Sequence, residues 1–120
     1  NTSGTVTITA VQDVLDETDE TVIVDVDTLT NGTESGTQQV SASITDDDLP
    51  PNITLAIDNA SIAETDGTGL VSVILDAVSG KDVTVTLSYS GTATSGGTDY
   101  SKSDSVTITA GNTSGTVSIA

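Results

Sequence analysis

An all-β fold, an antiparallel sandwich of about seven or eight strands, is predicted by three features of this sequence. Its 120 residues include no Phe, Trp, Met or Cys and two Tyr, so a core must be built from Val, Ile, Leu and Ala. Such β-branched residues, with the abundant Thr, favour strands, and strong helix formers are scarce. Apolar side chains alternate with Thr and Ser in short segments separated by Gly, Asn and Asp, which is typical of a sandwich.

The first three predicted strands lie before residue 48. In each of them an apolar side chain occupies every second position, so that these side chains share one face. The strands are residues 4–10 (with Val6, Ile8 and Ala10), 21–26 (with Val22, Val24 and Val26) and 39–45 (with Val40, Ala42 and Ile44).

Five more strands are predicted after the segment Leu49-Pro50-Pro51. Two adjacent prolines stiffen the chain and remove backbone donors, so residues 49–51 are predicted to be a linker. The strands that follow show the same short, largely β-branched pattern between turns. They are residues 53–57, 69–75, 83–89, 105–109 and 116–119.

The two ends of the chain repeat each other. Residues 1–8 read Asn-Thr-Ser-Gly-Thr-Val-Thr-Ile, and residues 112–119 read Asn-Thr-Ser-Gly-Thr-Val-Ser-Ile, at an offset of 111 residues. Self-similarity at a fixed period indicates a tandem array. We therefore expect residues 1–48 to be the second half of one repeat and residues 52–120 to be the first part of the next.

The net charge of −16 comes from 18 carboxylates against two lysines. Nucleic acid is not an expected partner, because phosphate binding needs basic residues. Such a charge opposes folding by self-repulsion, which leaves disorder, adaptation to high salt, or bound cations as interpretations. The regular strand pattern disfavours disorder. Membrane insertion is not expected, since no apolar run is long enough.

The carboxylates form clusters between the predicted strands. Calcium prefers six to eight oxygen ligands, and consecutive aspartates repel one another unless a cation or solvent screens them. The clusters therefore predict metal binding, with a solvated acidic loop as the alternative. They are Asp13, Asp16, Glu17, Asp19 and Glu20; then Asp46, Asp47 and Asp48; and finally Glu64, Asp66 and Asp99.

Four segments resemble the Calx-β domain, an Ig-like calcium-binding sandwich found in arrays. The first is the triple aspartate, residues 46–48, after Val-Ser-Ala-Ser-Ile-Thr, and the second is Gly-Thr-Ala-Thr-Ser-Gly-Gly-Thr-Asp-Tyr at residues 91–100. The others are the acidic residues 13–20 leading into Thr-Val-Ile-Val, and Ser-Ile-Ala-Glu at residues 61–64. The resemblance covers nearly the whole chain, with the two halves of the domain in permuted order.

The resemblance implies Ca²⁺ as the ligand, at one end of the sandwich near the junction between repeats. It implies a backbone carbonyl from Leu15 as a further ligand. This chain has Gln12-Asp13-Val14 where the family often has two or three acidic residues, so one or two ions are expected. The implied side-chain ligands are Asp13, Glu17, Glu20, Asp46, Asp47, Asp48, Glu64 and Asp99.

Catalysis is not expected, because the chain has no His and no Cys to form the usual nucleophile–base pairs. The predicted function is a structural extender repeat of an extracellular or bacterial cell-surface adhesin or filament, in which calcium stiffens the array. Neighbouring copies are its expected partners, and a surface or host ligand would bind other domains. Two alternatives remain: a calcium-dependent carbohydrate- or protein-binding module, and a subunit that polymerises by donating strands to its neighbours.

Overall fold

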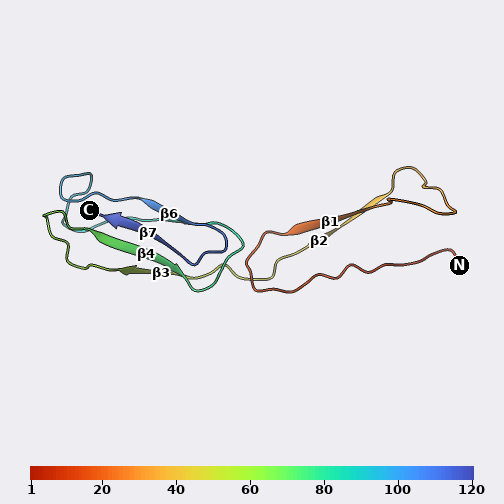
Figure 1. The fold of residues 1–120 in the computed structure, drawn as a ribbon, viewed down its shortest axis with the longest axis horizontal. Helices are drawn as coiled ribbons and strands as arrows, with labels where there is room; N and C mark the ends of the chain where they lie inside the picture. The colour runs from red at the N-terminus through yellow and green to blue at the C-terminus, as the bar shows by residue number, and fades with distance from the viewer.

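The computed structural model describes all 120 residues, and it is elongated, with extents of 83 × 25 × 19 Å (Figure 1). Seven strands and no helix are present, and all strand pairings are antiparallel, which confirms the predicted all-β fold. No segment has the helical length and apolar character that a membrane-spanning helix requires. The strands are β1 (Glu20–Asp25), β2 (Gln39–Ile44), β3 (Ile53–Ile57), β4 (Gly69–Leu75), β5 (Val83–Thr86), β6 (Ser105–Ile108) and β7 (Ser114–Ile119).

The C-terminal half, residues 52–120, contains five of these strands in two sheets. One sheet has the order β3-β4-β7, and the other consists of β5 and β6. The small core lies between them, where Val73 and Leu75 of β4 pack with Ile108 of β6. Val73 is fully buried because alternate residues of the central strand β4 face the second sheet.

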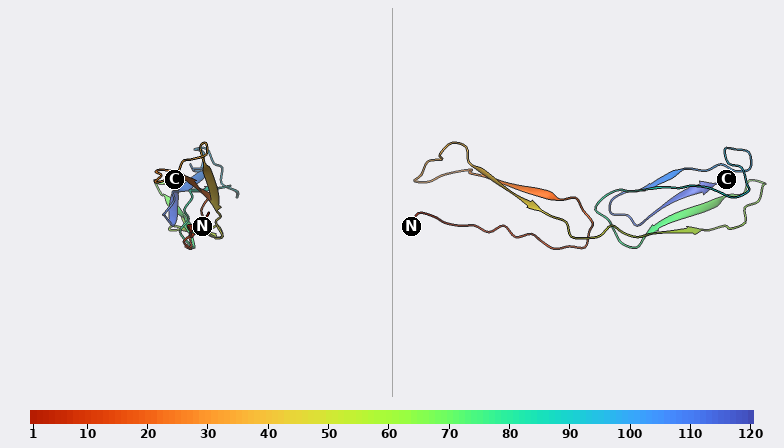
Figure 2. Two further views of the ribbon diagram at one scale, coloured as in Figure 1. Left: turned by 90° about the vertical axis from the view of Figure 1, so that its right-hand side faces the viewer. Right: turned by 180° about the vertical axis from the view of Figure 1, so that it is seen from behind.

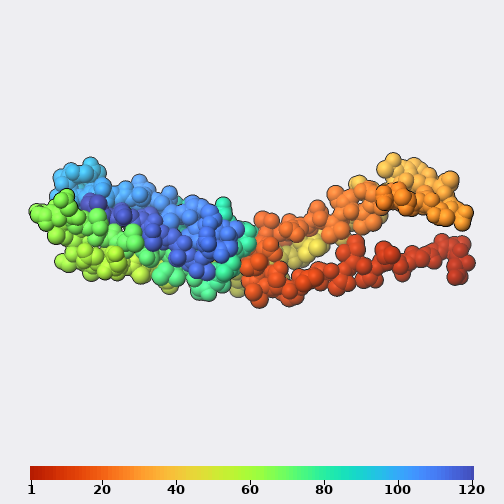
Figure 3. Space-filling view, in the orientation of Figure 1, coloured from red at the N-terminus to blue at the C-terminus, as the bar shows by residue number.

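The N-terminal half, residues 1–48, is open. It consists of an extended arm, residues 1–15, and a β1–β2 hairpin whose register pairs Val22 with Ala42 and Val24 with Val40. Figure 2 shows the arm and the hairpin as two separate branches directed away from the C-terminal half, and Figure 3 shows a gap between their far ends. No second sheet covers the hairpin, and Val40 is 69 % exposed.

The predicted strand at residues 4–10 is wrong for this structure, because that segment is extended but unpaired. A strand requires a partner for its backbone donors and acceptors, and no edge lies beside the arm. The other seven predicted strands are present, with small changes at their ends. The strand predicted at residues 83–89 stops at Thr86, although the Leu87 amide still donates to the Asp104 carbonyl at 2.7 Å.

The two halves meet through Asp16, which is the only buried residue of the N-terminal half. Its carboxylate accepts a hydrogen bond from the Lys81 ammonium at 2.9 Å, and its carbonyl accepts one from the Gly80 amide at 3.0 Å. The Ser79 hydroxyl lies 3.4 Å from the same carbonyl oxygen. A charge pair and a short backbone bridge therefore join the halves, and no apolar core extends across the junction.

Candidate metal site

The junction pocket is a cavity of about 150 Å³ where the end of the arm, the loop before β1 and the residues after β2 come together. Antiparallel pairing of Glu20 with Ile44 places the start of β1 beside the end of β2. The acidic loop before β1 and the aspartates after β2 are therefore neighbours, although about 30 residues separate them in sequence. Six of the eight predicted ligands line this pocket: Asp13, Glu17, Glu20, Asp46, Asp47 and Asp48.

Hydrogen bonds hold the two acidic segments together. The Gln12 amide nitrogen donates to Asp47 Oδ1 at 3.0 Å, and the Asp46 backbone amide donates to Asp19 Oδ1 at 2.9 Å. Within the arm, Asp13 Oδ1 accepts from the Leu15 amide at 2.9 Å. These contacts leave most carboxylate oxygens of the pocket without a protein donor, since each carboxylate can accept several hydrogen bonds.

The carboxylates of the junction pocket repel one another. The negative charge of Asp13 raises the pKa of Glu17, and desolvation together with the charges of Glu20 and Asp46 adds to this effect. Desolvation raises the pKa of Asp48, and the neighbouring charge of Asp47 acts in the same direction. Each shift means that the ionised form is disfavoured at its position, as expected for like charges gathered in one place.

No basic side chain compensates these charges. The chain has two lysines, and both are paired elsewhere: Lys81 with Asp16 and Lys102 with Asp104. The pocket therefore offers carboxylate oxygens in the number that calcium prefers, without a protein cation among them. No group of three or more acidic side chains is arranged to hold a metal ion in this structure, so a bound ion requires the side chains to turn toward it.

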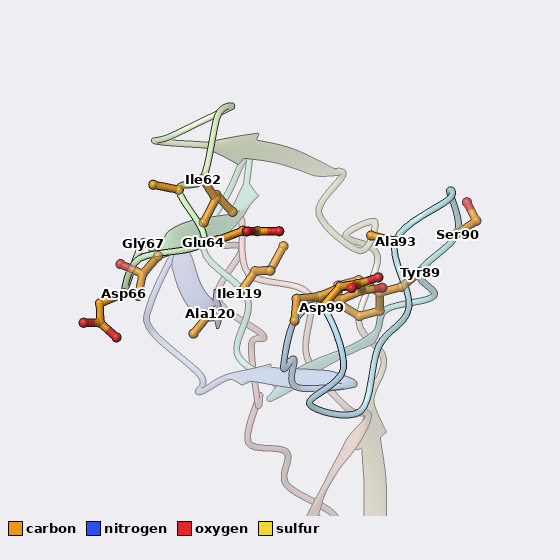
Figure 4. Close-up of a pocket in the computed structure, with 13 residues that line it drawn as sticks. Ile62, Glu64, Asp66, Gly67, Tyr89, Ser90, Ala93, Asp99, Ile119 and Ala120 are labelled. Carbon is orange, nitrogen blue, oxygen red and sulfur yellow. The ribbon is translucent and has the colours of Figure 1, made fainter.

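The other two predicted ligands lie elsewhere. Glu64 and Asp99, with Asp66, line a separate cavity of about 690 Å³ at the end of the C-terminal half that faces away from the junction (Figure 4). Glu64 stands in the loop between β3 and β4, and Asp99 in the loop between β5 and β6, where its Oδ2 accepts from the Thr94 amide at 2.7 Å. The structure thus divides the predicted ligand set into a group of six and a pair.

The cavity that Glu64 and Asp99 line, called the far cavity below, is also lined by the only two aromatic side chains of the chain. Tyr89 and Tyr100 line it with ring centroids 6.2 Å apart, and the Tyr89 hydroxyl donates to the Ser103 carbonyl at 2.7 Å. Ile119 of β7 and Ala120 lie in the same wall. This end of the C-terminal half therefore combines apolar surface with carboxylates from two loops.

Asp16 and Asp19 have roles that the sequence does not reveal. Asp16 joins the two halves by accepting from Lys81, and Asp19 fixes the first aspartate after β2 by accepting from its amide. The scarcity of lysine is the one signal in the sequence, because each of only two lysines among 18 carboxylates is expected to pair with a particular carboxylate. Leu15, whose carbonyl was an expected ligand, lies beside the pocket without lining it.

Comparison with protein-family models, with curated proteins and with solved structures finds no match to this chain.

Proposed function

We propose that this chain is a structural calcium-binding repeat of an extracellular array, of the Calx-β kind, in which calcium stiffens the junction between half-domains. The observation that carries the proposal is the junction pocket, where six carboxylates from two segments meet without a basic side chain. Calcium is the biological cation whose preferred ligands, six to eight oxygens in flexible geometry, agree with such a set.

The position of the pocket supports a mechanical role. Its carboxylates come from the arm, the hairpin and the residues just before Pro50, so an ion bound there would tie all three together. Apart from the contacts of Asp16 with residues 79–81, the N-terminal half has little that fixes its direction. An ion in the pocket would fix the arm to the base of the hairpin, next to the contacts of Asp16, and would remove the repulsion that raises the pKa of Glu17.

The pair at the far end supports the same proposal through the period of the sequence. Ala120 corresponds to Thr9 at the offset of 111 residues, so a copy that continues the period would bring the equivalent of Asp13 close after it. Because Ala120 lines the far cavity with Glu64 and Asp99, that copy would add its acidic loop to this pair. The complete eight-carboxylate site would then form between consecutive copies, with one group of six and one pair.

Thermal unfolding with and without calcium tests the proposal. Because calcium binds the folded junction, we expect a higher melting temperature at millimolar calcium, corresponding to about 2.7 kcal/mol when calcium is at 100 times its Kd. Magnesium should have a smaller effect, since it demands strict octahedral geometry. The chelator-treated protein gives the baseline.

Two double variants of equal charge separate specific binding from general screening. Asp46→Asn/Asp48→Asn should abolish the calcium-dependent rise in melting temperature, since both residues line the pocket. Asp27→Asn/Glu34→Gln, in the exposed loop between β1 and β2, should retain it. A melting temperature that calcium leaves unchanged, or that rises equally in both variants, would contradict a metal site at the junction.

A further inference from the structure

Residues 3–8 of the arm have the sequence of a strand of this fold but no partner. They read Ser-Gly-Thr-Val-Thr-Ile, whereas β7, Ser114–Ile119, reads Ser-Gly-Thr-Val-Ser-Ile. In β7 this sequence pairs along the whole edge of β4, and Val117 is 7 % exposed. In the arm, Val6 is 91 % exposed. Each chain therefore has two copies of this strand sequence but only one edge of β4 for them to pair with.

We propose that residues 3–8 of one copy of this chain pair with β4 of a second copy in the position of β7. The register follows from that of β7: Val6 lies opposite Val71, Gly4 opposite Val73, and Ile8 opposite Gly69. The incoming segment differs from β7 at one of the six positions, where Thr7 replaces Ser118. The contacts that β4 loses when β7 leaves are therefore nearly the same as those it gains from residues 3–8.

A glycine in the arm supports this pairing independently of the apolar residues. At Gly115 in β7, an added Cβ would lie 2.7 Å from a methyl carbon of Val106 and 3.2 Å from a side-chain carbon of Ile108. Close packing against β6 therefore requires glycine at that position of the strand. Gly4 is the equivalent residue, and nothing lies within 4 Å of the place where its Cβ would be. Pairing with β4 of a second copy gives Gly4 the same packing role as Gly115.

The hairpin that follows the arm provides the favourable surface for association. One face of the β1–β2 hairpin carries Val22, Val24 and Val40, and no sheet covers it. The hairpin follows the arm in the chain. When residues 3–8 pair with β4 of the second copy, this apolar face therefore comes close to the C-terminal half of that copy. Removing exposed apolar surface from water favours association, while the strand exchange itself is nearly neutral. The interaction needs no calcium, so its success or failure is separate from that of the metal site.

Cysteine cross-linking between two single variants of the full chain tests the register. The chain has no cysteine of its own, so mixing Val6→Cys with Val71→Cys gives a mixed disulfide only between different copies. We expect this heterodimer under mild oxidation in the presence of a chelator. The matched control mixes Val6→Cys with Ile74→Cys, because successive side chains alternate and Ile74 lies on the opposite face of β4 from Val71. Equal heterodimer yields in the two mixtures would overturn the proposal.

The glycine gives a second test in the same assay. Adding Gly4→Val to the Val6→Cys chain should lower the heterodimer yield about tenfold or more, because the new side chain would overlap Val106 of the second copy. Gly32→Val is the control, since its Cβ position is also open and it lies in the exposed loop after β1. A yield that Gly4→Val leaves unchanged would show that residues 3–8 do not occupy the position of β7.

Discussion

Two segments of this protein have almost the same sequence and opposite environments. In β7, the segment Ser-Gly-Thr-Val-Ser-Ile is hydrogen-bonded to β4 and its valine is 7 % exposed. In the arm, Ser-Gly-Thr-Val-Thr-Ile is unpaired and its valine is 91 % exposed. Local propensity is the same in both places. The difference shows that a strand pattern makes a segment able to join a sheet, whereas a free sheet edge decides whether it does.

The same contrast extends to the two halves of the chain. Six of the seven buried residues belong to the C-terminal half, where two sheets face each other across Val73 and Ile108. The N-terminal half has a single hairpin with an uncovered apolar face, and a lone two-stranded hairpin is marginally stable in water. The C-terminal half therefore provides most of the packing energy, and three predictions follow from this contrast.

The largest expected difference is between Ile108→Ala in the C-terminal half and Ile23→Ala in the hairpin. Ile108 is 2 % exposed, so its truncation leaves a cavity and should lower the free energy of unfolding by about 2–5 kcal/mol. Ile23 is 57 % exposed, and its truncation should cost less than about 0.5 kcal/mol. Urea unfolding followed by far-ultraviolet circular dichroism measures the loss in either half, and tyrosine fluorescence reports on the C-terminal half alone, since Tyr89 and Tyr100 both lie there. Equal losses would mean that the hairpin also has a core.

The next difference compares Gly115→Val with Gly4→Val at low protein concentration, where copies do not associate. The first adds a side chain against Val106, and such overpacking should cost about 1–3 kcal/mol. The second adds one to open space and should change stability by less than about 0.5 kcal/mol. The same urea experiment measures both. A large loss for Gly4→Val would indicate that the arm is packed within its own chain.

The smallest effect is the pH dependence of the junction. The pKa values of Glu17 and Asp48 are raised by neighbouring charge and desolvation, so their contribution favours folding while they are protonated and is lost as the pH rises through the raised values. In metal-free buffer, lowering the pH from about 7 to about 5 should therefore raise the melting temperature slightly. The pKa of Asp76 is lowered by its hydrogen bonds with Asn52, so this residue stays ionised across that window.

The matched variant for the pH effect is Glu17→Gln/Asp48→Asn, which removes both titrating groups. Its melting temperature should change less between the two pH values than that of the native chain. Saturating calcium should reduce the effect in the native chain, because a bound cation compensates the repulsion. A melting temperature that falls steadily from about pH 7 to pH 5 in metal-free buffer would contradict the proposed repulsion at the junction.

Much of the fold and part of the site could be predicted from the sequence. The eight predicted strands include all seven that the structure contains, and β3 and β4 match their predicted limits. The grouping of the acidic loop with residues 46–48 follows from antiparallel pairing of the strands between them. The role of Asp16 could not be predicted, because its partner Lys81 lies 65 residues away and no local pattern connects them.

The sequence by itself determined the all-β class, the positions of the strands and the gathering of carboxylates between them, because these depend on alternation and turn chemistry within a few residues. The tertiary structure alone decided which of two nearly identical segments is a strand, and it separated Glu64 and Asp99 from the other six carboxylates. Both outcomes depend on which sheet edges and loops are close in space. In the C-terminal half, β3 pairs with one edge of β4 and β7 with the other. The arm, which has nearly the same sequence as β7, is therefore left without a partner.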